Sequence, residues 1–484
     1  MGIAVMTVQA RPLAFKIVVI DDDPTGSQTV HSCPLLLRWG QETLRQGLRH
    51  PAPLLFVLAN TRALSLSEAA ERNREIVEAL AAAMAAEGLC PDQVQLVSRG
   101  DSTLRGHGVL EPQVLAEAWQ ERFEPVDATL HVPAFLSGGR TTVDGVHLLH
   151  GDPVHTTAFA QDRLFGYSTS DLAAWLEEKS GGAIAQSSVM RLDLAVLDRA
   201  AEGRSGGDPA GFTALLHRLE GLEGNQPVVV DATRAEQLEA LGAALHQLQG
   251  RKRFLFRSAA SLLNGLVDGG PSPLGPQSFD ARGLAGLRRQ QAGRPQPGLV
   301  MVGSHVPLAD QQLQLLLREP ACEGLELPVA RIARVLEGGQ CDWLLPDLEL
   351  EWRTQLEALL ARGCTPVLFT SRGELGFGEG EGAVLRRLRF GMELARLMGR
   401  LVAGLAPQLG YVISKGGITT GTLLAEGLGL EAVQLEGQLL PGLSLVRPLS
   451  AADSEHPGLP IITFPGNLGD ADTLVQAWRL MEGR

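Results

Sequence analysis

Short apolar runs alternate with helical patterns along most of this chain, and this alternation limits the fold more than any other sequence feature. Several runs are continuously apolar, for example KIVVID at 16–21 and LLFVLAN at 54–60. Strands have this composition when both faces of a parallel sheet are covered by helices. We therefore predict α/β architecture, with N-terminal strands at 16–21, 54–60, 94–98, 129–133, 228–231 and 254–257.

The clearest helix is predicted from about Glu68 to Ala86. Ser65 and Glu68 have the spacing of a capping box, in which each residue bonds the other's backbone. The alanine-rich body that follows has strong helix propensity.

A stretch rich in proline and glycine divides the chain. Residues 268–298 include DGGPSPLGPQSFDARG and QAGRPQPG, which continue neither a helix nor a central strand. A chain of 484 residues also exceeds what one core usually organises. We predict an N-terminal domain with a mostly parallel sheet over 1–267, a linker over 268–298, and a C-terminal α/β domain over 299–484. The strands predicted in the second domain are 299–302, 367–370, 411–414 and 461–464.

Composition narrows the class of partner. The net charge of −13 disfavours coating nucleic acid, although a few arginines can still form a pocket for a small anion. No apolar run approaches the roughly 20 residues that a membrane helix needs. Five scattered cysteines indicate a reducing compartment, and no basic start with an apolar stretch precedes the first strand. We expect a cytoplasmic protein whose oligomeric state is open, a homodimer included.

Polar loops follow three of the predicted N-terminal strands. The first strand ends in DDDPTG at 21–26, and crowded carboxylates are costly unless a cation or basic group is near. A surface Asp-Pro turn is the alternative interpretation. The third strand ends in SRGDSTLRGHG at 98–108, and the fourth runs into PAFLSGGRTT at 133–142. The carboxyl edge of such a sheet is where ligands bind.

These loops carry the groups that bind a small anionic polyol. Arginine offers a planar fork for carboxylate or phosphate, hydroxyls bond a polyol, and glycine lets the backbone approach an anion. Asp22 and Asp23 are the candidate catalytic residues. The candidate substrate-binding residues are Thr25, Gly26, Asp101, Ser102, Thr103, Arg105, Gly106 and Arg140. Asp144, His147 and His150, which follow shortly after, are weaker candidates.

The second domain carries glycine turns after its strands. A glycine pair with threonines lies at 414–422, before a helix predicted to begin near Leu423, and such a turn suits a phosphate. No GxxxxGK[ST] motif occurs. A GxGxxG dinucleotide motif that starts at Gly376 is incomplete, because Glu381 stands at the position of its third glycine. The candidate nucleotide-binding residues are Gly303, Ser304, Gly416, Gly417, Thr419, Gly466, Asn467 and Gly469.

These motifs, in this order, resemble the four-carbon acid sugar kinase family. DDPTG at 22–26, DSTLRG at 101–106 and PAF with the following GR at 133–140 match its N-terminal motifs. Gly303-Ser304 and GGIT at 416–419 match its nucleotide-domain motifs. The resemblance implies a sugar-acid-binding N-terminal domain, an ATP-binding C-terminal domain, and an active site in the cleft between them.

The resemblance also implies in-line transfer of phosphate from ATP with Mg²⁺ to threonate, erythronate or 3-oxo-tetronate. Arg105 and Arg140 would hold the carboxylate, Asp22 or Asp23 would accept the hydroxyl proton, and the other aspartate would help to hold magnesium through water. The metal ligands themselves are unknown. Many relatives have an asparagine where this chain has His107 and a lysine in the last glycine turn, where this chain has FPGNLG at 464–469. A non-catalytic sensor on the same scaffold and an NAD-dependent dehydrogenase are the alternatives.

Overall fold

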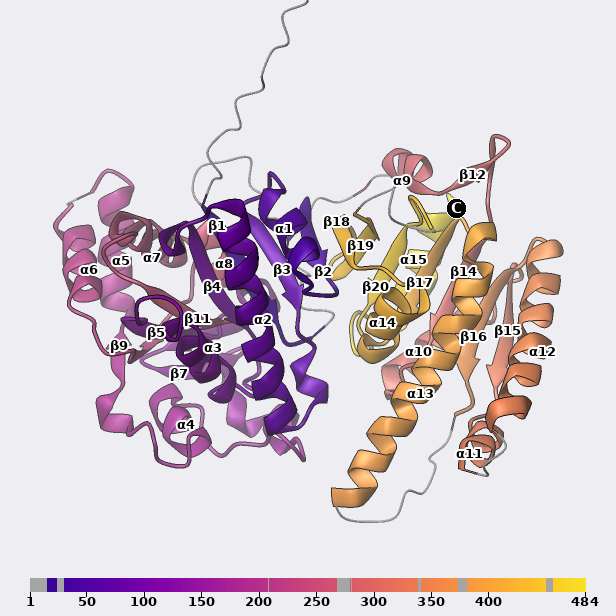
Figure 1. Cartoon of the computed structure of the whole chain (residues 1–484), viewed down its shortest axis with the longest axis horizontal. Helices are drawn as coiled ribbons and strands as arrows, with labels where there is room; N and C mark the ends of the chain where they lie inside the picture. The colour runs from indigo at the N-terminus through magenta and orange to yellow at the C-terminus, as the bar shows by residue number, and fades with distance from the viewer. Residues whose placement is uncertain are drawn as a thin grey trace, which may run out of the picture. The chain divides into compact units, whose positions relative to one another are not determined.

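The chain forms two compact units, Met1–Asp22 with Trp39–Ser272 and Asp23–Arg38 with Pro273–Arg484 (Figure 1). The computed structural model describes residues 15–23, 30–207, 209–267, 279, 281–337, 341–372, 381–449 and 456–484. Both units are α/β, as predicted. The exact domain boundaries stay a prediction, since residues 268–278 of the predicted linker lie outside the described residues. No helix in the described part of the chain is long and apolar enough to span a bilayer.

The first unit is built on a parallel sheet. Its strand order is β3-β1-β4-β11-β5-β10-β9, and every pairing within it is parallel. Strands β1, β3, β5 and β11 are buried along their whole length, as continuous apolar runs require. The six predicted strands are confirmed, each within two residues of its predicted ends, and β9 was not predicted. The bounds are β1 Lys16–Asp21, β3 Leu54–Leu58, β4 Val94–Arg99, β5 Ala128–Val132, β9 Met190–Leu192, β10 Gln226–Val230 and β11 Phe254–Ser258.

Helices connect these strands. The predicted helix is confirmed as α2 Leu66–Glu87, and its capping box is present: the Ser65 nitrogen donates to Glu68 Oε2 at 2.9 Å. Helix α2 packs against α1 and α3, while α7 packs against α5, α6 and α8 (Figure 1). The other helices are α1 Gln41–Arg49, α3 Leu110–Gln120, α4 Leu172–Lys179, α5 Leu194–Arg204, α6 Ala210–Glu220, α7 Ala235–Leu248 and α8 Ala260–Leu266. A small antiparallel sheet is formed by β6 Arg140–Val143, β7 Val146–Leu149 and β8 Asp152–Pro153.

The second unit has a mixed sheet in the order β15-β16-β14-β17-β20-β19-β18-β2. The five strands from β15 to β20 pair in parallel, and the remaining pairings are antiparallel. The last strand of this order, β2, comes from the N-terminal part of the chain and pairs with β18. The bounds are β2 Cys33–Leu36, β14 Gly298–Val302, β15 Cys322–Leu327, β16 Thr365–Thr370, β17 Tyr411–Lys415, β18 Ala432–Leu440, β19 Leu443–Pro448 and β20 Ile461–Phe464.

One predicted helix start in this unit is wrong. The helix after β17 begins at Gly417, as α14 Gly417–Thr422, and a π-helical turn at Leu423–Gly427 follows it directly. Gly416 turns the chain with φ +123°, and the Thr420 hydroxyl donates to the Ser414 carbonyl at 3.0 Å, so the helix begins early. The other elements are α9 Ala281–Leu287, β12 Gln290–Gln291, β13 Arg294–Pro295, α10 Pro307–Leu316, α11 Val329–Glu337, α12 Cys341–Ala361, α13 Glu381–Leu405 and α15 Thr473–Glu482.

Candidate active site

The carboxyl ends of five parallel strands meet at one edge of the first sheet. Asp21 at the end of β1 is in register with Leu58 of β3 and Arg99 of β4. Ser258 of β11 is in register with Arg99 and with Val132 of β5. The loops after these strands therefore start side by side, and they carry the residues predicted from the sequence.

Asp22 is held between two arginines. Its side chain is buried, and Oδ1 accepts a hydrogen bond from Arg62 Nη2 at 2.6 Å. Its Oδ2 lies 3.5 Å from Arg257 Nη2. Arg257 is itself buried and paired with Glu111. Asp22 therefore organises the arginines at this edge, whereas its neighbour Asp23 is half-buried.

Asp101 is the acidic centre of the second loop. Its Oδ2 accepts from Arg105 Nε at 2.7 Å and from the Thr103 hydroxyl. Burial alone would raise the pKa of Asp101, but the charges of Arg62 and Arg105 outweigh it and lower that pKa to about 2. Asp101 is consequently ionised in the neutral range and is a poor proton acceptor.

Arg105 and Arg140 present guanidinium groups beside this carboxylate. Arg105 lies over the Phe159 ring, 4.9 Å from its centroid, and Arg140 lies 5.7 Å from the centroid of Phe135. Among the described residues only the Nε of Arg105 is engaged, so its two terminal nitrogens remain available for an anion. Burial lowers the pKa of Arg140. The nearby charge of Asp101 raises this pKa and the charge of Arg105 lowers it, so the three groups interact electrostatically. Two cationic forks around one carboxylate suit an anionic ligand.

Buried polar groups hold the loop that contains Asp101 in place. His147 Nε2 lies 2.8 Å from the Ser102 carbonyl, and its Nδ1 lies 2.9 Å from the Thr142 hydroxyl. Burial lowers the pKa of His147 to about 4, so the ring is neutral and structural. Tyr167 donates its hydroxyl to the Thr103 carbonyl at 2.7 Å. Ser102 and Thr103 are themselves buried, and they shape the loop.

The cavity beneath the loop is too small for a sugar acid. It is lined by Asp101, Arg105, His131 and Trp175, among others, and the space open to the centre of a water molecule is about 20 Å³. A water molecule needs about 10–15 Å³ by this measure. The cavity therefore holds about one water molecule, whereas the side chain of Arg105 is 25% exposed to solvent.

Glycine is required where the loop passes Asp22. Gly106 has φ +93°, and a methyl group added there would lie 2.9 Å from Asp22 Oδ2. We expect Gly106→Ala to lower the free energy of unfolding by about 1–3 kcal/mol, because the backbone is strained and Asp22 is displaced. Urea unfolding measures this change. The matched control is Gly88→Ala, since Gly88 also has positive φ, +68°, but has open space around it. Equal losses in the two variants would contradict the crowding at Asp22.

The first unit brings Asp22, Asp101, Ser102, Thr103, Arg105, Gly106 and Arg140 to one edge, while Thr25 and Gly26 lie outside the described residues. The prediction missed Arg62 and Arg257. Arg62 follows the second predicted strand, so the rule that identified the other loops also applies to it. Arg257 lies inside an apolar strand, and an arginine in such a run is a signal of a buried ion pair.

The predicted phosphate-binding residues of the second unit also converge. A methyl group on Gly416 would lie 3.3 Å from the Ser304 nitrogen, and one on Gly466 would lie 2.5 Å from the Ser304 hydroxyl. A methyl group on Gly303 would overlap the side chain of Thr419. These close approaches make Gly303, Ser304, Gly416, Thr419 and Gly466 one cluster. Gly417 starts α14 beside it, and Asn467 and Gly469 belong to the exposed turn after Gly466.

A cavity of about 590 Å³ adjoins this cluster, with Gly303 and Thr419 in its lining. Arg372, also in the lining, donates from Nη1 to the Ser304 carbonyl at 2.6 Å, and its Nε and Nη2 have no hydrogen-bond partner among the described residues. Val329, Leu394 and Met398 supply apolar surface. The cavity has a suitable size for a nucleotide. Its lining is mostly apolar, and a cationic side chain lies near the glycine cluster, as a nucleotide site requires.

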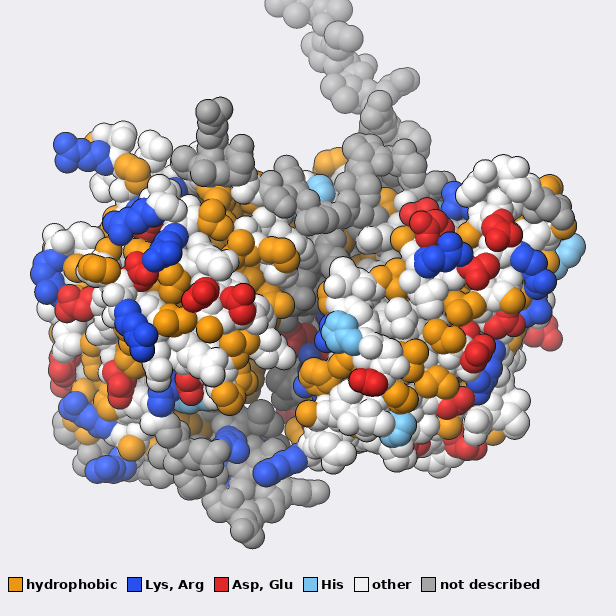
Figure 2. Space-filling model, turned by 180° about the vertical axis from the view of Figure 1, so that it is seen from behind, with side chains coloured by type: hydrophobic (Ala, Val, Ile, Leu, Met, Phe, Trp, Pro, Cys, Tyr) orange, Lys and Arg blue, Asp and Glu red, His pale blue; other side chains and the backbone are white. Residues whose placement is uncertain are grey.

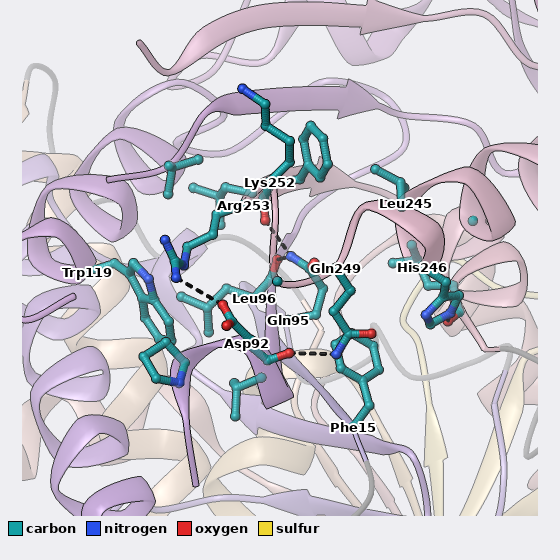
Figure 3. Close-up of a pocket in the computed structure, with 18 of the residues that line it drawn as sticks. Phe15, Asp92, Gln95, Leu96, Trp119, Leu245, His246, Gln249, Lys252 and Arg253 are labelled. Atoms are coloured by element: carbon teal, nitrogen blue, oxygen red, sulfur yellow. Dashed lines mark hydrogen bonds and ion pairs between the residues drawn. The ribbon is translucent and has the colours of Figure 1, made fainter. Parts of the chain in front are cut away.

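A hollow at the opposite edge of the first sheet differs from these sites because its polar groups are paired with each other (Figure 3). Arg253 Nη2 lies 2.9 Å from Asp92 Oδ1, and Gln249 donates to the Asp92 carbonyl at 2.6 Å. Lys252 donates to the Leu222 carbonyl at 2.6 Å. With these groups engaged, the hollow offers little to a charged ligand.

The surface charge is mixed. On the face shown in Figure 2, basic and acidic side chains are interspersed, and the chain carries a net charge of −13. Such a face disfavours broad contact with a polyphosphate backbone.

Comparison with known proteins identifies both halves of the chain. Residues 17–266 match the sugar-binding N-terminal domain family, and residues 299–474 match the nucleotide-binding C-terminal domain family. A D-threonate kinase of Cupriavidus necator is 27% identical over 394 residues, 80% of each chain. A D-threonate kinase of Salmonella typhimurium is 25% identical, covering 96% of this chain and 98% of its own. A D-erythronate kinase of Heliobacterium modesticaldum is 25% identical and covers 94% of this chain and 95% of its own.

Solved structures share the fold. A Salmonella typhimurium protein superposes with a TM-score of 0.64 at 18% identity, covering 96% of this chain and 98% of its own. A Haemophilus influenzae protein superposes with a TM-score of 0.60 at 16% identity, covering 96% of this chain and 100% of its own. With both domain families matched in order along the chain, and with kinases of four-carbon acids among its relatives, this protein belongs to the four-carbon acid sugar kinase family.

Proposed function

We propose that this enzyme transfers the terminal phosphate of ATP to a hydroxyl of a four-carbon sugar acid of the threonate or erythronate type. The observation that carries the substrate class is the arrangement of Arg105 and Arg140 around Asp101 in the first unit. Two guanidinium groups hold the carboxylate of the acid, and the ionised Asp101 accepts hydrogen bonds from its hydroxyls.

The nucleotide binds in the second unit in this proposal. The backbone of Gly303, Gly416 and Gly466 approaches the phosphates, and Arg372 neutralises part of their charge. The cavity beside Thr419 takes the nucleoside, with Val329, Leu394 and Met398 against the base. Mg²⁺ usually binds through substrate phosphates, waters and one or two carboxylates, so it would arrive with ATP and would need no cage of protein ligands.

Phosphoryl transfer then depends on positioning and charge neutralisation. Asp23 is the better candidate to accept the proton of the attacking hydroxyl. It is half-buried, whereas Asp22 is fully buried and engaged by Arg62 and Arg257. Asp22 keeps these two arginines in place beside the acid.

The test is a panel of four-carbon acids, including both threonate and erythronate stereoisomers and 3-oxo-tetronate, assayed for ADP release with ATP and Mg²⁺. Mass spectrometry of the product should show one added phosphate on one of these acids. If ATP and an acid both bind, as measured by thermal shift, while no ADP is released with any of them, the protein is a sensor and the proposal fails.

A further inference from the structure

A fully buried lysine lies beneath the glycine cluster of the second unit. Lys415 is the last residue of β17, directly before Gly416, and its exposed fraction is 0%. Its carbonyl accepts from the Gly303 nitrogen at 3.0 Å, and the Gly416 nitrogen donates to the Phe464 carbonyl at 2.8 Å. Lys415 therefore stands where β14, β17 and β20 all end, at the point from which the three glycine turns start.

The ammonium group of Lys415 points to the last of these turns. Its Nζ donates to the Pro465 carbonyl at 3.0 Å and lies 3.7 Å from the centroid of the Phe464 ring. A carbonyl and a ring face each attract a cation, but neither carries a negative charge. No carboxylate of the described residues forms an ion pair with it, and burial lowers its pKa to about 7.

The charged groups on neighbouring elements are engaged elsewhere. His305, after β14, lies 2.9 Å from the Thr370 hydroxyl, and Asp470, after β20, accepts from the Thr473 hydroxyl at 2.8 Å. Arg372, after β16, lies 3.2 Å from Asp310. Helix α14, which packs on β17, consists of glycine, isoleucine and threonine. A buried charge without a counterion is costly, so an anion at these turns would lower that cost.

We propose that Lys415 is the buried positive centre for the nucleotide phosphates, and that nucleotide binding is coupled to proton uptake by its side-chain amine. The inference deepens the proposed function and rests on its nucleotide site. Lys415 acts through the turn that covers it, so it positions and attracts the phosphates and takes no part in bond formation. The amine is largely neutral without nucleotide at pH 8, and phosphates above the turn favour its protonated form.

Isothermal titration of the full chain with ADP and Mg²⁺ at pH 8, in two buffers of different ionisation enthalpy, measures the coupling. We expect uptake of about 0.5–1 proton per ADP. For each unit by which ADP raises the pKa of the Lys415 amine, ADP binds the protonated protein about tenfold more tightly than the neutral form. The affinity for ADP should therefore fall as the pH rises from 7 to 9.

Lys415→Met keeps the length and apolar stem of the side chain while removing its charge. We expect this variant to lose proton uptake and to bind ADP at least about tenfold more weakly at pH 7. Without nucleotide, its melting temperature should be no lower than that of the parent. The matched control is Lys16→Met in the first unit. Lys16 is also buried, donates to the carbonyls of His50 and Ala52, and has its pKa lowered to about 8 by burial. Loss of Lys16 should leave uptake on ADP binding unchanged.

The outcomes separate this inference from the kinase proposal. Tight ADP binding without proton uptake in the parent protein overturns the role of Lys415, even if Lys415→Met does not fold, and leaves the kinase proposal standing. Proton uptake that persists in Lys415→Met also overturns it. Coupled ADP binding with no turnover on any acid supports Lys415 and contradicts the kinase proposal. Failure of the parent to bind ADP contradicts both.

Discussion

Replacing Arg105 with lysine is expected to raise the KM for the sugar acid about 10- to 100-fold while the KM for ATP changes little. A hydrogen bond to a charged group contributes about 1.5–3 kcal/mol, and lysine cannot reproduce the planar fork with which the proposed site binds both carboxylate oxygens. Lysine also loses the stacking on Phe159 that orients the guanidinium, 4.9 Å from the ring centroid. Steady-state kinetics with each substrate varied in turn measures the two KM values.

Arg253→Lys is the matched control for this change. Arg253 is a partly buried arginine of the same unit, paired with Asp92 and Glu124 at the opposite edge of the sheet. Its replacement should leave both KM values within about twofold, because surface ion pairs contribute about 0–1 kcal/mol. An unchanged KM for the acid in Arg105→Lys would remove Arg105 from the carboxylate site, and equal rises for the acid and ATP would indicate general damage.

The first unit was predictable from sequence because its strands are buried on both faces. Continuous apolar runs identified β1, β3 and β11 within two residues of their ends. The parallel arrangement then placed the loops of Asp22, Asp101 and Arg140 at one edge without further information. Arg257 escaped prediction because its buried pairing with Glu111 joins residues that are far apart in sequence.

The second unit was less predictable because part of its sheet is antiparallel. Strands β18 and β19 form a hairpin with polar residues along it, and β2 comes from the other end of the chain. Such pairings leave a weaker sequence pattern than buried parallel strands. Lys415 was not predicted as a site residue, because a lysine beside two glycines is typical of an exposed turn. It is buried where the ends of three neighbouring parallel strands meet.

Replacing Asp23 with asparagine is expected to lower kcat about 10²- to 10⁴-fold while the binding of ADP and of the acid changes little. General-base assistance contributes about this much, and asparagine keeps the shape but cannot accept the hydroxyl proton. Single-turnover ADP release together with titration of each ligand separates the chemical step from binding. Its direct comparison is Asp22→Asn, which places the same change on the neighbouring aspartate.

The two variants should fail in different ways. Asp22 accepts from Arg62 and lies beside Arg257, so its neutralisation removes a buried negative charge next to both arginines. This change should lower the free energy of unfolding by about 3 kcal/mol and weaken binding of the acid. Asp23→Asn should lower the free energy of unfolding less than Asp22→Asn does, because Asp23 is half-buried and Asp22 is buried. An unchanged kcat in Asp23→Asn would remove Asp23 from the proton-accepting role. A large kcat loss in Asp22→Asn with normal stability would transfer that role to Asp22, because a residue that only positions arginines affects binding and folding before it affects the chemical step.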